Sequence, residues 1–214
     1  PAAAKLKFGF GDVIEELLIL LVQATGHTVT GRQDRVEIEG IVGHRDGIID
    51  GVLVDVKSAS SYSFNKFKEG LIPKEDAFGY IGQLQGYLEG SQNDPLLLDK
   101  QRCAFLVMDK TLGHICLDIH PRSLSSVRDV ILERKNVVNG KELPERFFKE
   151  EEDGYFNYNR KEFIPNGNLK LGVNCGYCDM RKACWGEYRT FLSSKGPVYF
   201  TKIVKEPKMF EVKE

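Results

Sequence analysis

The sequence predicts an α/β fold in which helices flank a mixed sheet. Apolar residues follow helical spacing over 12–24, alternate as in a strand from Thr28 onward, and return to helical spacing over about 79–90. Two more apolar segments, near 103–109 and 114–119, are typical of strands and precede a last helix. The order helix, three strands, helix, two strands, helix favours a mixed sheet covered by helices.

The composition indicates one globular domain inside a cell. The 214 residues can bury one substantial core, so we expect a single domain over 1–214 with its core at about 9–136. The 30 Lys and Arg residues balance 31 Asp and Glu residues, which excludes a surface coated with positive charge but allows a local basic cleft. Five cysteines, an odd count, argue against a secreted disulfide framework. The longest strongly apolar run, 17–22, is too short to span a membrane, so we expect a cytoplasmic protein.

Local signals predict where two helices begin. Asp12 and Glu15 resemble a capping box at the start of the helix over 12–24. Pro121 is expected to open another helix, which runs to about Lys135.

Three segments are predicted to lack regular structure. Residues 59–78 are rich in Ser, Lys and Phe and are expected to form a long surface loop. Residues 139–172 show little periodicity, and the Cys-containing segment at about 170–190 is expected to be irregular.

The strands around Asp50-Gly51 predict an unusual pair of carboxylates. Asp-Gly is a strong signal for a two-residue type I′ hairpin, and that turn sets the register. Asp46 then faces Asp55, with Cα atoms only ~4.5 Å apart, and Lys57 shares their face of the sheet. Facing carboxylates repel. A divalent cation would compensate them; the alternative is a solvated polar strand in which Lys57 pairs with Asp55.

A hard cation beside a lysine is suited to one class of reaction. Mg²⁺ and Mn²⁺ favour carboxylate oxygens and keep several waters. An ion of this kind stabilises charge on a scissile phosphate and lowers the pKa of an attacking water, and Lys57 could hold that water or a phosphate oxygen. The hairpin therefore points to hydrolysis of a phosphodiester.

These residues resemble a known family. Asp46, followed after eight residues by Asp55-Val56-Lys57, resembles the D…(D/E)xK motif of the PD-(D/E)XK nuclease superfamily. Gln83 and Tyr87 resemble the Q-x-x-x-Y motif of its RecB-like exonuclease branch, although an i, i+4 pair on a helix can also be ordinary amphipathic surface.

The resemblance implies a fold and roles for these residues. The fold would be restriction-endonuclease-like, with a mixed sheet flanked by helices. Asp46, Asp55, Lys57, Gln83 and Tyr87 would be catalytic. Lys57 would position the nucleophilic water, and the last two residues would orient the site or the DNA backbone.

The family also places an acid in its first helix, four residues after a glycine. Glu15 follows Gly11 at that spacing, which would make it a metal ligand together with Asp46, Asp55 and the Val56 carbonyl. A purely capping role for Glu15, or use of Glu16 instead, is the alternative.

Three cysteines, Cys175, Cys178 and Cys184, form a C-x2-C-x5-C pattern that is typical of a metal site. The pattern resembles part of the iron–sulfur staple of CRISPR-associated RecB-like exonucleases and of the AddB nuclease domain. Those families place a fourth cysteine ahead of the first helix, and no cysteine precedes residue 103 here. A structural [4Fe–4S] cluster completed by Cys103 or Cys116, a Zn²⁺ ion in place of the cluster, and no metal at all remain alternatives.

Basic residues in the 59–78 segment are the candidates for DNA binding. Lys66, Lys68 and Lys74 accompany Phe64 and Phe67, a combination that could follow a single strand, although charged loops are commonly just solvated.

The resemblance implies a Mg²⁺- or Mn²⁺-dependent exonuclease that acts on single-stranded or duplex DNA ends. The setting would be phage or bacterial recombination, repair or replication, in a bacterial or phage-infected cytoplasm, with room for a recombination or replication partner protein. The rivals are an endonuclease or resolvase of the same fold, and a non-catalytic zinc-containing nucleic-acid-binding module.

Overall fold

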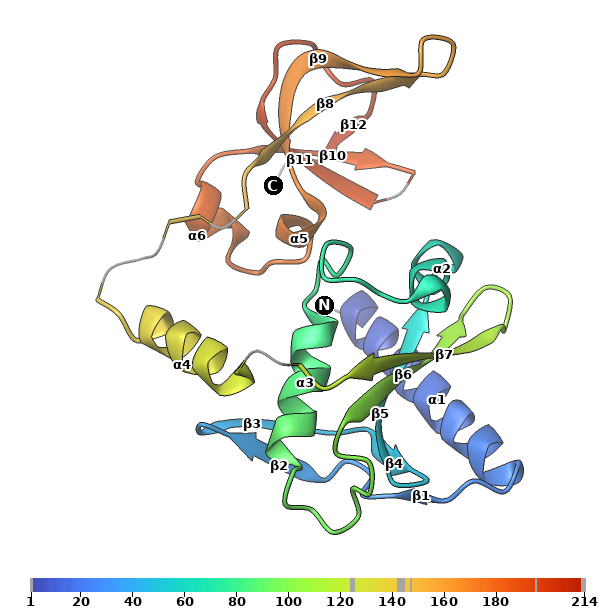
Figure 1. Cartoon of the computed structure of the whole chain (residues 1–214). Helices are drawn as coiled ribbons and strands as arrows, with labels where there is room; N and C mark the ends of the chain where they lie inside the picture. Colours follow the sequence, from blue (N-terminus) through green and yellow to red (C-terminus); the bar gives the residue numbers. More distant parts are fainter. Residues whose placement is uncertain (1, 124–125, 142–144, 147, 195, 213–214) are drawn as a thin grey trace. The chain divides into compact units, whose positions relative to one another are not determined.

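The computed structural model describes residues 2–123, 126–141, 145–146, 148–194 and 196–212, and its contacts divide the chain into two compact units (Figure 1). The first unit spans Pro1–Lys141 and the second Glu142–Glu214. Each unit has a five-stranded sheet of its own. That both units act together as one nuclease domain stays a prediction.

The sheet of the first unit is mixed, as the sequence predicts. Its strand order is β1-β4-β5-β6-β7; β5 and β6 are parallel, and the other neighbours are antiparallel. The strands are β1 (Val29–Thr30), β4 (Gly47–Ile49), β5 (Val52–Ala59), β6 (Arg102–Asp109) and β7 (Ile115–Pro121).

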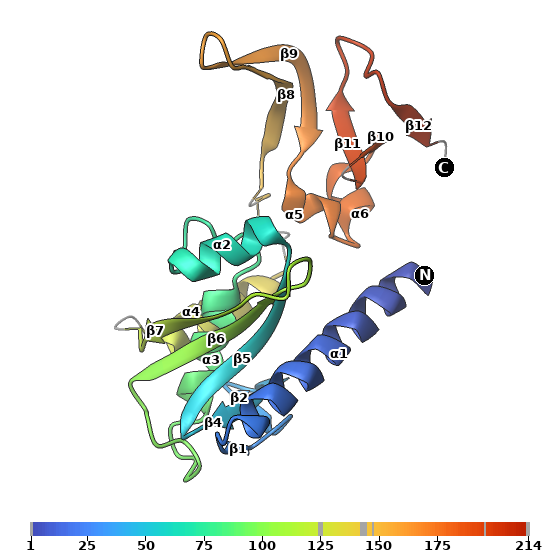
Figure 2. The same ribbon diagram turned by 90° about the vertical axis from the view of Figure 1, so that its right-hand side faces the viewer.

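Helices cover both faces of this sheet (Figure 2). α1 (Ala2–Ala24) buries Ile14 and Leu18 against β5 and β6 on one face. On the other face, α2 (Ser61–Glu69) and α3 (Tyr80–Gly90) bury Phe64, Phe67, Leu84 and Leu88. The alternation of β5 supplies both cores, since Leu53 points to α3 while Val54 and Val56 point to α1.

A separate hairpin packs beside α3. It consists of β2 (Arg35–Ile38) and β3 (Ile41–His44), joined by a turn at Glu39-Gly40 in which both residues have positive φ. α4 (Val127–Val138) is fastened to this turn, because Arg128 pairs with the Glu39 carboxylate at 2.7 Å and the Lys135 Nζ donates to its carbonyl at 2.5 Å.

Two predicted helix starts are wrong. α1 begins at Ala2, so Asp12 lies inside the helix and cannot form a capping box with Glu15. Pro121 ends β7 instead of opening a helix; α4 starts at Val127, where the side chain of Ser126 caps its first turn.

Two segments predicted to be irregular are ordered. Residues 61–69 form α2, because Ser60 caps the helix and Phe64 and Phe67 supply a buried face. Within the 139–172 segment, β8 (Glu150–Asn157) and β9 (Glu162–Leu171) belong to an antiparallel sheet in the order β12-β10-β11-β9-β8, whereas the Cys-containing segment holds the short helices α5 (Val173–Gly176) and α6 (Arg181–Trp185). Because β8 has no buried residue, it lacks the apolar alternation that signals a strand.

The elements of the second unit are β8 (Glu150–Asn157), β9 (Glu162–Leu171), α5 (Val173–Gly176), α6 (Arg181–Trp185), β10 (Arg189–Ser193), β11 (Gly196–Lys202) and β12 (Phe210–Val212). Across the described residues of both units, no helix combines the length and hydropathy that a bilayer span requires.

Candidate active site

The hairpin that carries the two aspartates has the predicted turn and register. Asp50 and Gly51 have φ of 49° and 82°, as a type I′ turn requires, and Gly47 pairs with Val54. The Asp50 carboxylate also accepts a hydrogen bond from the Thr28 N–H at 2.9 Å, which ties the turn to the end of the first helix–strand connection.

Pairing between β4 and β5 stops at Gly47, so the preceding residue, Asp46, lies beside β5 without being part of the ladder. This end of the ladder creates the site. A longer ladder would pair the Val56 N–H with Arg45, but the Arg45 N–H bonds to the Asp34 carbonyl beside the β2–β3 hairpin instead. The Asp46 carboxylate takes the vacated place and accepts the Val56 N–H at 2.6 Å. By the same alternation, the Val56 carbonyl faces this open edge of β5.

A buried arginine fixes the point of departure. The Arg45 side chain is only 2% exposed, and its guanidinium contacts Asp34 at 2.9 Å and Asp94 at 2.6 Å. Its Nε donates to the Gly31 carbonyl at 3.0 Å. These bonds hold the chain just before Asp46, so the neighbouring carboxylate starts from a rigid position.

Asp55 and Lys57 form a close pair on the α3 side of β5. The Lys57 Nζ lies 2.5 Å from Asp55 Oδ2 and 5.1 Å from the centroid of the Tyr80 ring. Asp55 is 3% exposed, and its buried Oδ2 is the oxygen that pairs with Lys57. Burial raises the pKa of Asp55 to about 6; Lys57 opposes the rise, and the charge of Asp46 adds to it.

Glu15 completes a cluster of carboxylates. Burial, and then the negative charge of Asp46, raise the pKa of Glu15. Burial is also the main cause that raises the pKa of Asp46, against the Val56 N–H and Lys57. Glu16 is directed elsewhere, into an ion pair with Arg32. The structure therefore brings Glu15, Asp46, Asp55 and Lys57 together, and the acids repel one another.

The donor set of this cluster fits a hard divalent cation. Carboxylate oxygens and a backbone carbonyl are the ligands that Mg²⁺ and Mn²⁺ prefer, and the repulsion among these acids favours a bound cation. Two of the carboxylates already have protein partners: Asp46 holds the Val56 N–H, and Glu15 accepts from Gln33 at 2.8 Å. Within the described ranges, no three His, Cys, Asp or Glu side chains are arranged so as to hold an ion as they stand.

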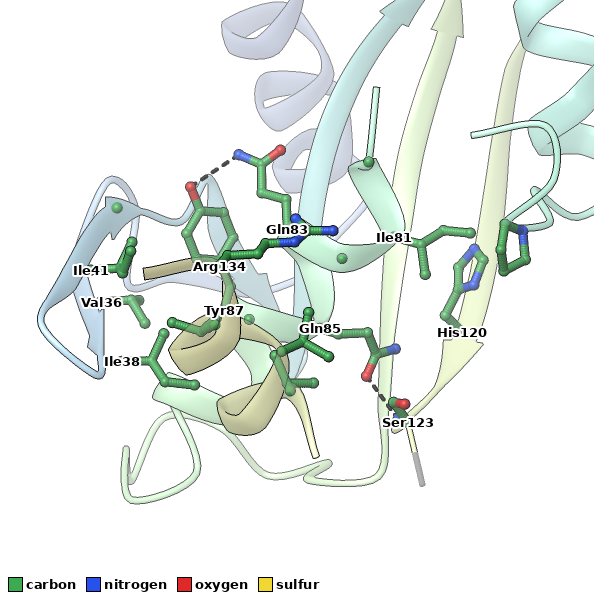
Figure 3. A pocket seen from close by; sticks show the side chains of 18 of the residues that line it. Val36, Ile38, Ile41, Ile81, Gln83, Gln85, Tyr87, His120, Ser123 and Arg134 are labelled. Carbon is green, nitrogen blue, oxygen red and sulfur yellow. Dashed lines mark hydrogen bonds between the residues drawn. The ribbon is translucent and has the colours of Figure 1, made fainter. Parts of the chain in front are cut away.

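Gln83 and Tyr87 lie on one face of α3, as predicted, and bond to each other. The Gln83 Nε2 donates to the Tyr87 hydroxyl at 3.1 Å (Figure 3). The Tyr87 ring stands against Gly43 of β3, where an added Cβ would lie 2.6 Å from the ring. Both side chains line a cavity of about 680 Å³.

The predicted DNA-binding lysines lie on or just after α2. Lys66 and Lys68 are on the helix, and Lys74 is exposed in the loop that follows it. Lys66 also lies 5.1 Å from the centroid of the Tyr62 ring. Phe64 and Phe67 are 4% and 5% exposed, so the expectation that they follow a DNA strand is wrong; they are core residues. A DNA contact through the lysines stays a prediction.

The three clustered cysteines meet in the second unit. Cys175 is buried on α5, whereas Cys178 and Cys184 are exposed, and all three line one cavity of about 90 Å³. Cys103 and Cys116 are on β6 and β7 of the first unit, and burial raises the pKa of Cys103 to about 12. Metal binding by the cysteines stays a prediction.

Sequence reasoning missed two neighbours of the predicted site. Tyr80 places its ring beside the Lys57 ammonium group, and an aromatic residue at the start of a helix gives no signal of that contact. Gln33, which holds Glu15, has a φ of 52° in a connection with no recognisable motif.

Comparisons with known proteins give two weak structural similarities. An alkaline exonuclease from Laribacter hongkongensis has a TM-score of 0.41 and 20% identity, over 59% of this chain and 61% of that chain. The protein designated SSO0001 has a TM-score of 0.37 and 15% identity, over 64% and 62%. The matched part thus spans about three fifths of either protein. No family model and no curated protein sequence matches.

Proposed function

We propose that this protein is a metal-dependent deoxyribonuclease of the PD-(D/E)XK superfamily, in its RecB-like branch, which hydrolyses phosphodiester bonds from DNA ends. The observation that carries the proposal is the cluster at the open edge of β5. Three mutually repelling carboxylates and a lysine gather there, and the buried Asp55 carboxylate pairs with that lysine.

Glu15, Asp46, Asp55 and the Val56 carbonyl would hold Mg²⁺ or Mn²⁺. Asp46 accepts the Val56 N–H through Oδ2 and Glu15 accepts from Gln33 through Oε1, so the other oxygen of each carboxylate is not engaged in these bonds. When bound, the ion would supply positive charge for the scissile phosphate and a lower pKa for a bound water. Among the described residues, Lys57 is the cation that pairs with Asp55, and burial still raises the pKa of this acid, so Asp55 gains most from an ion.

Lys57 acts as a cation in this scheme. Burial lowers its pKa, but Asp55 and Asp46 outweigh that effect and raise it above the ordinary value, so the ammonium group persists at neutral pH. A charged Nζ donates hydrogen bonds and cannot accept a proton. Lys57 therefore positions the attacking water or a phosphate oxygen, while Gln83 and Tyr87 orient the DNA backbone.

End-labelled linear DNA tests the proposal directly. Wild-type protein with Mn²⁺ should release labelled nucleotides from linear DNA and leave closed circles intact. Asp55→Asn and Lys57→Ala should lose at least about a hundredfold in rate, since each removes a group that acts on the reacting phosphate. Lys110→Ala removes an exposed charge elsewhere on the first unit and should cleave as wild type does.

The same assay separates the rival functions. Cleavage of closed circles would identify an endonuclease or resolvase of the same fold. Binding without cleavage of any DNA would favour the non-catalytic module. If Lys57→Ala cleaves at the wild-type rate, the proposed site is wrong.

We propose that Cys175, Cys178 and Cys184 hold a structural [4Fe–4S] cluster or Zn²⁺, on the strength of their spacing and shared cavity. Anaerobically purified protein should show a visible absorption band if iron–sulfur is present, and metal analysis should find zinc otherwise. Protein that contains neither metal contradicts this proposal.

For the nuclease as a whole, we propose a role in phage or bacterial recombination, repair or replication, with a partner protein in the cytoplasm.

A further inference from the structure

The first unit contains a cavity of about 680 Å³ that the proposed hydrolysis does not by itself require. Its size falls within the ~300–1,000 Å³ of sites that bind small molecules. The β2–β3 hairpin and α4 supply apolar walls that include Val36, Ile38 and Ile131. Both walls are held in place, because Glu39 in the hairpin turn binds Arg128 and Lys135 of α4.

Glycines of α3 leave the floor of this cavity empty. Gly82 and Gly86 lie one turn apart and line it, and a Cβ at either position would meet no atom within 4 Å. Gly86 is nevertheless buried. Glycine inside a helix costs roughly 1 kcal/mol relative to alanine, so α3 loses stability to keep this space.

Gln83, Tyr87 and Arg134 form one end of the cavity, its polar end. Figure 3 shows Gln83, Tyr87 and Arg134 at that end, with Ser123 and His120 on the opposite side. Apart from their mutual bond, Gln83 and Tyr87 have no side-chain hydrogen bond within the described residues. Arg134 forms neither an ion pair nor a hydrogen bond with any described residue, so its charge is available to an anion.

Two connections join this polar end to the carboxylate cluster. α3 begins at Tyr80, whose ring lies beside the Lys57 ammonium group, and Gln83 follows three residues later. On the opposite wall, Gly43 contacts the Tyr87 ring, and the chain reaches Asp46 three residues later. Each connection spans three residues, so the polar end of the cavity and the carboxylate cluster are built on neighbouring parts of the same elements.

We propose that this cavity receives an unpaired nucleobase of the DNA strand being cut, with Arg134 contacting the adjacent phosphate. Apolar walls accept the face of any base, and Gln83 and Tyr87 can bond to a base edge or to the sugar. A base can enter only when it is unpaired, so the preferred substrate is a single-stranded or frayed end. This inference rests on the proposed nuclease function and specifies its substrate.

Binding without cleavage tests the proposal. Fluorescence anisotropy in EDTA would compare a labelled single-stranded oligonucleotide with a blunt-ended hairpin duplex. Wild-type protein should bind the single strand about tenfold more tightly. Gly86→Leu fills the cavity and should remove most of this difference, and Gly86→Ala should have a smaller effect. Gly9→Leu, at an exposed helical glycine of α1, is the matched control for added bulk.

Arg134 provides a second test that does not disturb the fold, since its side chain is exposed on α4. Arg134→Ala should weaken single-strand binding several-fold and reduce the slope of log K against log salt by about 0.7, as loss of one phosphate contact requires. Lys110→Ala removes the same charge away from the cavity and should change neither quantity.

The outcomes separate this inference from the nuclease proposal. If Gly86→Leu folds and binds single strands as wild type does, the nucleobase site is wrong even where DNA is cleaved. If Gly86→Leu does not fold, wild-type binding by Arg134→Ala leads to the same conclusion. Equal wild-type affinity for the single strand and the blunt duplex also overturns it. If wild type cleaves no DNA while Gly86→Leu loses single-strand binding, the nuclease proposal fails and the nucleobase site stands.

Discussion

At the scale of single residues, Asp55 carries the largest electrostatic cost in the site. Its carboxylate is 3% exposed, and burial raises its pKa to about 6. Below the unfolded value of about 4 the group is protonated in both states and costs nothing. As the pH rises from about 4 to about 6, the unfolded chain ionises first, so the folded state loses stability relative to it.

Asp55→Asn should therefore stabilise the metal-free protein at pH 7 while it abolishes hydrolysis. The free energy of unfolding in EDTA should rise by about 1–3 kcal/mol, because a neutral amide replaces a poorly compensated buried charge. Urea titrations at pH 4 and pH 7 would measure this, and the gain should shrink at pH 4. A variant less stable than wild type at pH 7 would show that the Asp55 charge is well compensated without a cation.

Two adjacent glutamates on α1 give an internally matched comparison. Glu15 lies within the field of Asp46, whereas Glu16 pairs with Arg32 on the surface. Glu15→Gln should lower the apparent affinity for Mn²⁺ in the cleavage assay at least about tenfold, and Glu16→Gln should leave it unchanged. Equal effects of the two substitutions would remove Glu15 from the metal site.

At the scale of elements, what sequence can predict depends on how local the signal is. The register of β4 and β5 follows from Asp50-Gly51 alone, and the face shared by Gln83 and Tyr87 follows from helical spacing. The departure of the chain at Asp46 depends on Arg45, which reaches Asp34 and Asp94. That buried network joins distant segments and leaves no periodic signal.

The sequence prediction missed the first part of α1 and the helix that contains Phe64 and Phe67. α1 extends back to Ala2 through Gly9 and Gly11, residues that disfavour a helix when sequence is considered alone. The burial of Phe64 and Phe67 depends on contacts with β6, such as the Phe67–Phe105 ring pair at 5.3 Å. Tertiary packing therefore decides the burial of the two aromatic rings, which sequence spacing does not show.

Gly43 of β3 lies directly against the Tyr87 ring of α3. An added methyl group would lie 2.6 Å from Tyr87 Cε1, so Gly43→Ala must displace the tyrosine ring or the strand. We expect a loss of about 1–3 kcal/mol in the free energy of unfolding and a lower cleavage rate, because Tyr87 would lose its bond with Gln83. Gly113→Ala would be a poor control because of its φ of 72°; Gly9→Ala on α1, where an added Cβ meets no atom within 4 Å, isolates the effect of the contact. Unchanged stability of Gly43→Ala would show that the approach is not tight in solution.

At the scale of the whole molecule, charge limits how DNA can be held. With 30 basic and 31 acidic residues, the chain has no general attraction for phosphate, so binding must depend on a few local contacts. The candidates for these contacts are three lysines in the same unit as the carboxylate cluster: Lys66, Lys68 and Lys74. The joint replacement of these lysines by alanine should weaken DNA binding and reduce its salt dependence, with little change in the rate at saturating DNA. Binding and salt dependence equal to those of wild type would place the DNA elsewhere.

The central claim is that the acids at the edge of β5 are assembled for a divalent cation. Calorimetric titration of Mn²⁺ into metal-free protein tests it most directly, with Asp46→Asn and Asp55→Asn titrated alongside. We expect one Mn²⁺ per first unit to bind wild type and both variants to lose at least about tenfold in affinity. Wild-type affinity in both variants, or no Mn²⁺ binding by the wild-type protein, would contradict the account.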